Sequence, residues 1–242
     1  MEKSSVKAIL FDLDGVLTPT ADLHMAAWKK MFSEYFGSRG VRDYVDSDYF
    51  RFLDGKPRAE GIKSLLADRE ITLAEGDVDD GSEADTVAGL GERKNSYFLA
   101  ALEEGIEPYP GSVAYLDHLK DTDIELAVVS SSKNAKFVLE SAGLADRFEV
   151  VVDGLVAAEK QIAGKPRPDT YEFAASLINL PSTGCVVVED ATSGVAAGAA
   201  GDFALVVGVD RGAGAHNLLE AGADIVIDDL AELIDKIPEA EA

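Results

Sequence analysis

Cysteine is almost absent from this sequence of 242 residues, in which Cys185 is the only one. A single thiol cannot form a disulfide within the chain, and its place at the head of the apolar run Cys-Val-Val-Val indicates a buried structural thiol. Long apolar runs are absent too, since none approaches the roughly 18 residues that a membrane-spanning helix needs. These absences argue against redox chemistry with paired thiols and against a membrane span.

Basic residues are scarce relative to acidic ones. The sequence has 22 Lys and Arg against 45 Asp and Glu, a formal net charge of -23. Such a surface repels nucleic acid and anionic lipid, and we expect neither as a partner. A small phosphorylated substrate is compatible with this charge, because a few cations that converge with a divalent metal ion reverse the field locally. The N-terminal Met-Glu-Lys-Ser-Ser lacks the basic leader of a secretory signal, and nothing calls for a dimer, so we expect a cytoplasmic monomer.

Short β-branched runs alternate with helical stretches over most of the chain. The expected strands cover residues 6–11, 124–129, 148–152, 185–188, 204–207 and 225–227. Helices are expected between them, for example over 112–120 with Ser112 as a candidate N-cap and over 168–177 with proline in the first turn. This alternation is typical of parallel sheets with crossover helices. The sequence therefore predicts an α/β protein whose core is a Rossmann-like doubly wound parallel sheet.

The segment after the first strand has a different periodicity. Between residues 19 and 104 the strand signals vanish and apolar residues recur at helical spacing. We therefore predict a core domain formed by residues 1–18 and 105–242, with an α-helical cap domain inserted over 19–104. The acidic stretch 75–93 within the insertion is expected to form an irregular, mobile loop.

Two carboxylates, Asp12 and Asp14, follow the first apolar strand and precede Gly15. Ligand sites of open α/β sheets lie at the carboxyl ends of the strands, so both side chains should reach such a site. A calcium-binding loop counted from Asp12 would need glycine at Leu17 and glutamate at Leu23, and neither is present. A structural pair of aspartates is the alternative, although two buried like charges need compensating cations.

Three later strand ends supply such compensating groups. They are Ser130 in Val-Val-Ser-Ser-Ser-Lys-Asn, Lys165 in Gly-Lys-Pro-Arg-Pro-Asp, and Glu189 with Asp190 in Val-Val-Val-Glu-Asp. Each has a structural alternative: a serine after a strand often caps a helix, a lysine before proline can be solvated, and an acidic pair can cap the next helix. Together with Asp12 and Asp14 they predict a site for Mg²⁺ and a phosphoryl group.

The four segments, in this order, resemble the four motifs of the haloacid dehalogenase-like phosphatase superfamily, within its β-phosphoglucomutase-like branch. The resemblance covers nearly the whole chain. It implies that Asp12 attacks phosphorus to form an aspartyl phosphate and that Asp14 donates a proton to the leaving oxygen. By the same resemblance, Ser130 would bind the phosphoryl oxygens and Lys165 would neutralise charge on that group and on Asp12.

The resemblance also implies a Mg²⁺ cofactor, held by Asp12, Asp190 and the backbone carbonyl of Asp14. Glu189 would be either a further ligand or an acceptor that orients a metal-bound water. Because Mg²⁺ takes oxygen ligands and commonly keeps several waters, the residues alone leave both roles of Glu189 open.

The helical insertion resembles the cap of this family, which closes over the core and selects the substrate. The candidate substrate-binding residues are His24, Trp28, Gly55, Arg58 and Lys94 in the insertion and Ser130, Ser132, Lys133 and Asn134 in the core. Without the resemblance, His24 and Trp28 would be packing residues, and Arg58 and Lys94 would be solvated surface charges. Pro19 replaces the acidic residue that many relatives carry at the hinge and, by fixing φ, should stiffen it.

The resemblance favours a mutase that moves phosphate between C1 and C6 of a β-hexose phosphate, in particular from β-glucose 1-phosphate to glucose 6-phosphate through the 1,6-bisphosphate. The cations of the insertion suit a second phosphate. The alternative is a phosphatase for a sugar phosphate or another small phosphomonoester, in which water resolves the same aspartyl phosphate. A third interpretation, a silent phosphosugar sensor, conflicts with the intact set of core residues.

Overall fold

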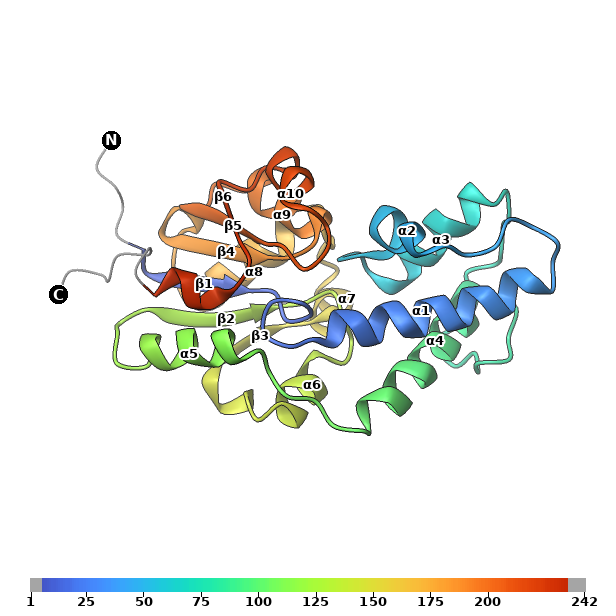
Figure 1. Ribbon diagram of the computed structural model, residues 1–242, viewed down its shortest axis with the longest axis horizontal. Coiled ribbons are helices and arrows are strands. Elements are labelled where there is room, and N and C mark those ends of the chain that lie inside the picture. Colours follow the sequence, from blue (N-terminus) through green and yellow to red (C-terminus); the bar gives the residue numbers. More distant parts are fainter. Residues whose placement is uncertain (1–5, 235–242) are drawn as a thin grey trace. The chain divides into compact units, whose positions relative to one another are not determined.

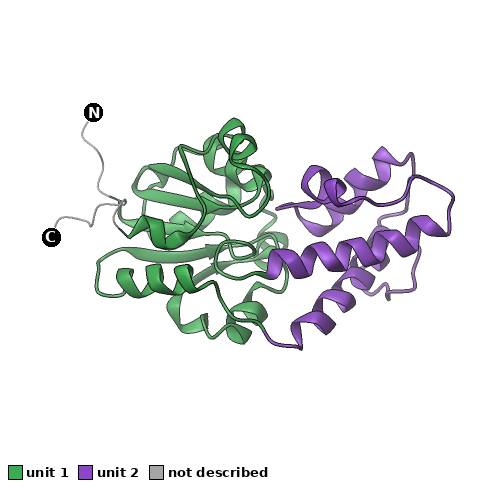
Figure 2. Ribbon diagram, viewed as in Figure 1, with its two compact units in different colours: residues 1–19, 106–242 green, residues 20–105 purple. Residues whose placement is uncertain are grey.

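The computed structural model describes residues 6–234, and the chain forms two compact units (Figures 1 and 2). One unit comprises the chain up to Pro19 and from Ile106 onward, and the other runs from Thr20 to Gly105. None of the helices in the described part of the chain has the length and apolar character needed to cross a bilayer.

The first unit is built on a parallel sheet. Its strands are β1 (Ala8–Phe11), β2 (Glu125–Val129), β3 (Val150–Val152), β4 (Cys185–Glu189), β5 (Leu205–Val209) and β6 (Ile225–Ile227). They lie in the order β3-β2-β1-β4-β5-β6, and every neighbouring pair is parallel. This order is that of a doubly wound Rossmann-like sheet, which confirms the predicted fold class. The thiol of Cys185 is buried, as predicted.

Helices and short 3-10 turns connect the strands. They are α5 (Pro110–Leu119), α6 (Ala135–Ser141), η2 (Ala145–Arg147), α7 (Gly154–Lys160), α8 (Asp169–Leu177), η3 (Ser182–Gly184), α9 (Thr192–Ala200), α10 (Ala215–Ala221) and η4 (Leu230–Leu233). The helix predicted over 112–120 instead begins at Pro110, because proline fits the first turn, where no N–H donor is needed. Ser112 is therefore not the N-cap, and its buried hydroxyl donates to the carbonyl of Val16 at 2.7 Å.

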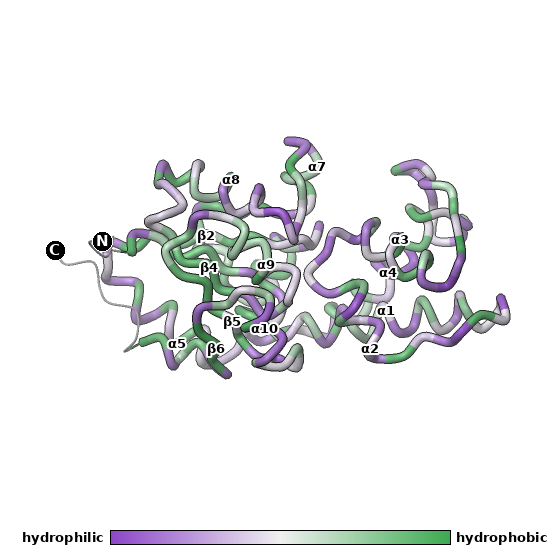
Figure 3. Tube along the Cα trace, turned by 90° about the horizontal axis from the view of Figure 1, so that it is seen from above, coloured by the Kyte–Doolittle hydropathy of each residue, from purple (hydrophilic) through white to green (hydrophobic). Residues whose placement is uncertain are grey.

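Strand β1 occupies the middle of the sheet because it is apolar on both faces. Ala8 and Leu10 belong to a buried cluster with Tyr171 of α8. On the alternate face, the Phe11 ring meets the edge of the Tyr115 ring of α5 with 6.2 Å between centroids. In Figure 3, strands β2 and β4 on either side of it carry the green of hydrophobic residues. The carboxyl end of β1 is thus held rigidly between two layers of helices.

The second unit is helical, and no strand lies between Thr20 and Gly105. Its elements are α1 (Thr20–Gly37), α2 (Asp46–Asp48), the π-helical turn η1 (Tyr49–Leu53), α3 (Arg58–Asp68) and α4 (Val87–Leu102). The aromatic residues of α1 build its core, since the ring of Phe32 stacks on Phe36 at 5.1 Å and on Trp28 at 5.7 Å. This unit has a hydrophobic core of its own.

The prediction of an irregular loop over 75–93 is wrong for its last part, because α4 begins at Val87. Thr86 caps this helix: its Oγ1 accepts a hydrogen bond from the Gly89 N–H at 3.0 Å and donates to Asp80 Oδ2 at 2.6 Å. A threonine directly before an apolar helical face is a start signal, which the acidic composition of the stretch obscured.

Candidate active site

The carboxyl ends of three neighbouring strands carry polar residues that the sequence analysis singled out. Asp12 follows β1, Ser130 follows β2, and Glu189 is the last residue of β4. Phe11 lies level with Val188 in the ladder, and the Asp12 N–H donates to the Val188 carbonyl at 2.9 Å. The chain changes its winding direction between β1 and β4, which is where ligands bind in doubly wound sheets. These residues therefore lie at the edge of the sheet that suits a ligand site.

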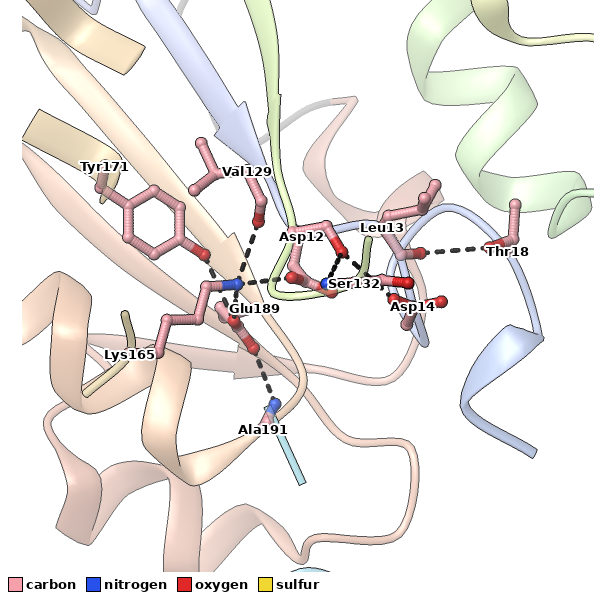
Figure 4. Close-up of polar contacts among 11 residues, drawn as sticks. Asp12, Leu13, Asp14, Thr18, Val129, Ser132, Lys165, Tyr171, Glu189 and Ala191 are labelled. Carbon is pink, nitrogen blue, oxygen red and sulfur yellow. Dashed lines mark hydrogen bonds and ion pairs between the residues drawn. The ribbon is translucent and has the colours of Figure 1, made fainter. Parts of the chain in front are cut away.

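Lys165 joins two carboxylates of this edge. Its Nζ donates to Asp12 Oδ1 at 2.5 Å, to Glu189 Oε1 at 2.6 Å and to the Val129 carbonyl at 3.0 Å (Figure 4). The three N–H groups of the ammonium are thereby used, and the side chain is 1% exposed. The ring of Tyr171 lies 5.0 Å from Nζ, and its hydroxyl donates to Glu189 Oε1 at 3.3 Å. These contacts hold the buried cation in one place.

The cluster of Asp12, Glu189 and Lys165 has one more carboxylate than cations. Burial raises the pKa of the Asp12 carboxyl well above its usual value, and the ion pair with Lys165 only partly offsets that rise. The carboxylates of Glu189 and Asp14 raise the pKa of Asp12 further. Burial alone would lower the pKa of Lys165, but Asp12 and Glu189 outweigh it and keep that pKa well above its usual value. A bound cation would relieve the excess of negative charge.

Three buried carboxylates are close enough to share a metal ion. Asp12, Glu189 and Asp190 each offer one oxygen, and these oxygens lie within 4.8 Å of one another. Gly15 makes room for them, since a Cβ built there would lie 1.8 Å from Asp190 Oδ2. Its φ of +85° is also a conformation that glycine adopts readily. Oxygen donors of this kind fit a hard divalent cation such as Mg²⁺.

Both oxygens of Glu189 accept hydrogen bonds from the protein. Oε1 accepts from Lys165 and Tyr171, and Oε2 accepts from the N–H of Ala191, just before α9, at 2.9 Å. The N-cap of α9 is Ala191, so neither residue of the acidic pair occupies the capping position that the structural alternative assumed. A Cβ at Gly194 would lie 1.7 Å from Oε1, so this glycine is needed to accommodate the carboxylate. The sequence analysis missed Gly194, for which the only signal was its place in the first turn of the helix after Glu189.

The side chain of Asp14 lies beside Ser130. Ser130 Oγ donates to Asp14 Oδ2 at 3.3 Å and accepts from the Ser132 N–H at 3.0 Å. Ser132 Oγ accepts in turn from the Asn134 N–H at 3.1 Å, whereas Lys133 is exposed. The segment after β2 is therefore a hydrogen-bonded turn next to Asp14.

In the helical unit, a second group of predicted residues meets where α1 and α4 pack. Lys94 Nζ contacts His24 Nδ1, and the His24 ring stacks on Phe98 with 4.0 Å between centroids. Nζ also lies 5.1 Å from the ring of Trp28 and 4.8 Å from that of Phe98. Lys94 is 2% exposed, so it is not the solvated surface charge that its local sequence suggested.

Arg58 begins α3 and contacts α4. Its Nη1 donates to Glu92 Oε1 at 3.0 Å, and its Nη2 donates to Asn95 Oδ1 at 2.9 Å. Burial lowers the pKa of Arg58, and the charge of Glu92 opposes that shift. Gly55 lies in the preceding turn with a φ of +66°. The sequence analysis missed Glu92 and Asn95, although their spacing of three residues puts them on one face of α4.

Comparison with known proteins identifies the class of enzyme. A family model for haloacid dehalogenase-like hydrolases matches residues 6–202. The chain belongs to this family, and it is an enzyme of phosphoryl transfer or phosphate ester hydrolysis. Within the family it is β-phosphoglucomutase-like: the β-phosphoglucomutase of Mycobacterium tuberculosis is 46% identical over 241 residues, which cover 95% of this chain and 92% of that protein.

Two further relatives represent the two activities considered above. The crystal structure of β-phosphoglucomutase from Clostridium difficile has a TM-score of 0.77 and 28% identity, covering 94% of this chain and 93% of that one. Hexitol phosphatase A of Escherichia coli is 32% identical over 196 residues, which cover 80% of this chain and 79% of that protein. Similarity to this chain therefore extends to proteins named as mutases and as phosphatases.

Proposed function

We propose that the protein is a Mg²⁺-dependent β-phosphoglucomutase that converts β-glucose 1-phosphate into glucose 6-phosphate through the 1,6-bisphosphate, with Asp12 as the nucleophile. The main support is Lys165, a buried ammonium that bonds both Asp12 and Glu189. A cation in this place reduces the repulsion between an attacking carboxylate and a phosphoryl dianion. The name of the 46% identical relative supports the choice of substrate.

The reaction would proceed in two transfers that share one aspartyl phosphate. Asp12 would attack phosphorus as the bond from phosphorus to the donor oxygen breaks, and Asp14 would give that oxygen a proton. In the second transfer a sugar hydroxyl would lose its proton to Asp14 while its oxygen attacks the phosphorus of phospho-Asp12, and the bond from that phosphorus to Asp12 would break and release the carboxylate. Ser130 would donate to the phosphoryl oxygens, and the hydrogen bond from Lys165 would orient Asp12. The phosphoryl group passes from one sugar oxygen to another by way of Asp12, so no water is consumed and no free phosphate is released.

Asp12 and Asp190, with the backbone carbonyl of Asp14, would hold Mg²⁺. When bound, the ion supplies positive charge that stabilises the phosphoryl group in transfer. Glu189 would not bind the ion directly, because protein donors already engage both of its oxygens. Its role would be to fix Lys165 and to support the ligands, as outer groups of metal sites commonly do.

The helical unit would act as a cap that selects the acceptor of the phosphoryl group. Arg58 would bind the second phosphate of the sugar bisphosphate, which would take the place of Glu92 on its planar fork. Lys94 and His24 would bind the sugar or the same phosphate. The other proposed contacts of the phosphorylated sugar are Trp28, Gly55, Ser132, Lys133 and Asn134. We propose that the protein needs no second subunit for these contacts and acts as a monomer.

A sugar-phosphate phosphatase is the second candidate function. The 32% identity to hexitol phosphatase A favours it, because the same core residues would serve when water, in place of a sugar hydroxyl, attacks phospho-Asp12. The two functions differ only in the acceptor.

One assay distinguishes the two candidates. The protein is supplied with β-glucose 1-phosphate, Mg²⁺ and a trace of the 1,6-bisphosphate, and glucose 6-phosphate and free phosphate are measured together. We expect glucose 6-phosphate to form with little free phosphate. Free phosphate without glucose 6-phosphate would contradict the mutase and support the phosphatase. If neither glucose 6-phosphate nor free phosphate forms, the silent sensor is supported. The Asp12→Asn variant provides the baseline for both measurements.

A further inference from the structure

Consecutive backbone carbonyls of the turn after β1 accept hydrogen bonds from distant parts of the same unit. The Gly15 carbonyl accepts from Arg211 Nε at 3.1 Å, and the Leu17 carbonyl accepts from the Tyr109 N–H at 3.0 Å. The carbonyl between them accepts from Ser112 Oγ at 2.7 Å. Three donors from other segments therefore hold the turn that follows the two aspartates: a backbone N–H, a hydroxyl and a guanidinium.

Arg211, between β5 and α10, is the charged member of this set. Its Nη1 donates to the Asp228 carbonyl at 2.9 Å, and its Nη2 lies 3.5 Å from Asp229 Oδ2. Its Cζ lies 4.0 Å from the ring centroid of Tyr109. A planar guanidinium with two donors engaged and one face stacked has little freedom to move. It therefore presents a fixed donor to Gly15.

On its other side, Gly15 lies against the acidic cluster. A Cβ built there would lie 1.8 Å from Asp190 Oδ2 and 2.5 Å from its Cγ, so no side chain separates the turn from this carboxylate. Because Asp14 is the residue directly before Gly15, any displacement of Gly15 changes the spacing between the turn and Asp190. The hydrogen bond from Arg211 restrains such a displacement.

We propose that Arg211 is a positioning residue, which keeps the turn from Asp12 to Gly15 at a fixed distance from Asp190 and thereby maintains both Mg²⁺ binding and the alignment of the nucleophile. It would act through the Gly15 carbonyl and make no contact with the substrate. The inference rests on the proposed roles of Asp12 and Asp14, and it holds whether a sugar or water accepts the phosphoryl group.

The test is Arg211→Met, which keeps much of the aliphatic stem and removes every donor. We expect kcat to fall about 10-fold to 100-fold with little change in KM, because a slight misplacement of catalytic groups acts on this scale. The affinity of the substrate-free protein for Mg²⁺, measured by calorimetry, should fall about 10-fold. Amide hydrogen exchange in a peptide covering residues 13–18 should accelerate, because a restraint on the turn is lost.

Arg147→Met is the matched control. Arg147 belongs to the same unit and pairs at the surface with Asp117 at 2.6 Å, away from the turn in sequence and in contacts. It should leave kcat, Mg²⁺ affinity and exchange at 13–18 unchanged. Arg211→Lys keeps the charge but not the planar fork, so intermediate values are expected. This variant carries the test if Arg211→Met does not fold.

Unchanged exchange at 13–18 together with unchanged Mg²⁺ affinity in Arg211→Met would overturn the inference. An Asp12→Asn variant measured in parallel tells this failure from a failure of the proposed function. If Asp12→Asn stays active, the proposed function is wrong. If Asp12→Asn is inactive while Arg211→Met behaves as wild type, only the positioning role is refuted.

Discussion

Within residues 6–234, each of the two units buries one lysine, and the two lysines have different surroundings. In the sheet unit, Lys165 donates to two carboxylates, those of Asp12 and Glu189. In the helical unit, Lys94 contacts an imidazole, that of His24, and lies over the rings of two aromatic residues. The first setting compensates negative charge around the proposed nucleophile, whereas the second is a polarisable aromatic surface of the kind that binds ligands.

The difference follows from how sheets and helices gather side chains. Parallel strands bring residues that are far apart in the chain to one edge, so acidic and basic groups from separate segments meet there. Helices place neighbours four residues apart on one face, as with His24 and Trp28, or Lys94 and Phe98. The sheet edge therefore suits a phosphoryl-transfer step that is the same for a sugar and for water as acceptor. The helical face suits recognition of one particular acceptor. Four substitutions test this division.

The largest effect is expected for Asp12→Asn. An amide is a poor nucleophile, so turnover should fall by about 10⁴-fold or more, and no phosphoenzyme should be detected by mass spectrometry. The fold should be retained, because Lys165 keeps its hydrogen bonds to Glu189 and to the Val129 carbonyl in this variant. Asp14→Asn is the comparison variant: it should still accumulate some phosphoenzyme while transfer to and from the sugar slows. Normal turnover in Asp12→Asn would remove Asp12 from its assigned role.

The next effect is expected for Lys165→Met. Removal of this cation leaves the carboxylates of Asp12 and Glu189 buried without a compensating positive charge. The free energy of unfolding should therefore fall by about 3–5 kcal/mol in the absence of metal. Urea denaturation measures the change, and added Mg²⁺ should restore part of it. Lys136→Met, at an exposed position of α6, is the control and should be neutral. A Lys165→Met variant as stable as the control would show that the two buried carboxylates do not need this cation.

A smaller effect, and one of a different kind, is expected for Lys94→Met. Methionine fits an aromatic environment, so the melting temperature should not fall. Formation of glucose 6-phosphate should drop by about 10²-fold with little change in the amount of phosphoenzyme, because only acceptor binding is affected. Lys30→Met is the matched control, since Lys30 also lies over an aromatic ring, that of Tyr97 at 4.0 Å, but is exposed. Loss of phosphoenzyme in Lys94→Met would place Lys94 in the chemistry itself.

The smallest effect is expected for Tyr171→Phe. This change removes the hydroxyl that donates to Glu189 Oε1 and keeps the ring beside Lys165. We expect a loss of stability of about 1 kcal/mol and a several-fold lower kcat. Tyr115→Phe is the control, because the buried Tyr115 hydroxyl has no hydrogen-bond partner in the described part of the chain. Equal effects of both changes would show that the bond to Glu189 has no role.

Much of the sheet could be predicted because its signals are local. The β-branched runs predicted at 124–129 and 185–188 lie within a residue of β2 and β4, since a buried parallel strand needs a continuous apolar run. The starts of two helices were not predicted. Pro110 begins α5, although Ser112 was the candidate N-cap, and Thr86 caps α4 within a stretch whose acidic composition suggested a loop.

By itself, the sequence determined the fold class, the enzyme family and the segments that supply the candidate catalytic groups, because each depends on residue types at fixed spacing. Only the tertiary structure decided which groups touch. It shows that Lys165 bonds Glu189 as well as Asp12, that Glu92 engages Arg58, and that Arg211 holds Gly15. Such contacts join segments that are tens to hundreds of residues apart, and backbone geometry sets their distances. No pattern along the chain encodes them.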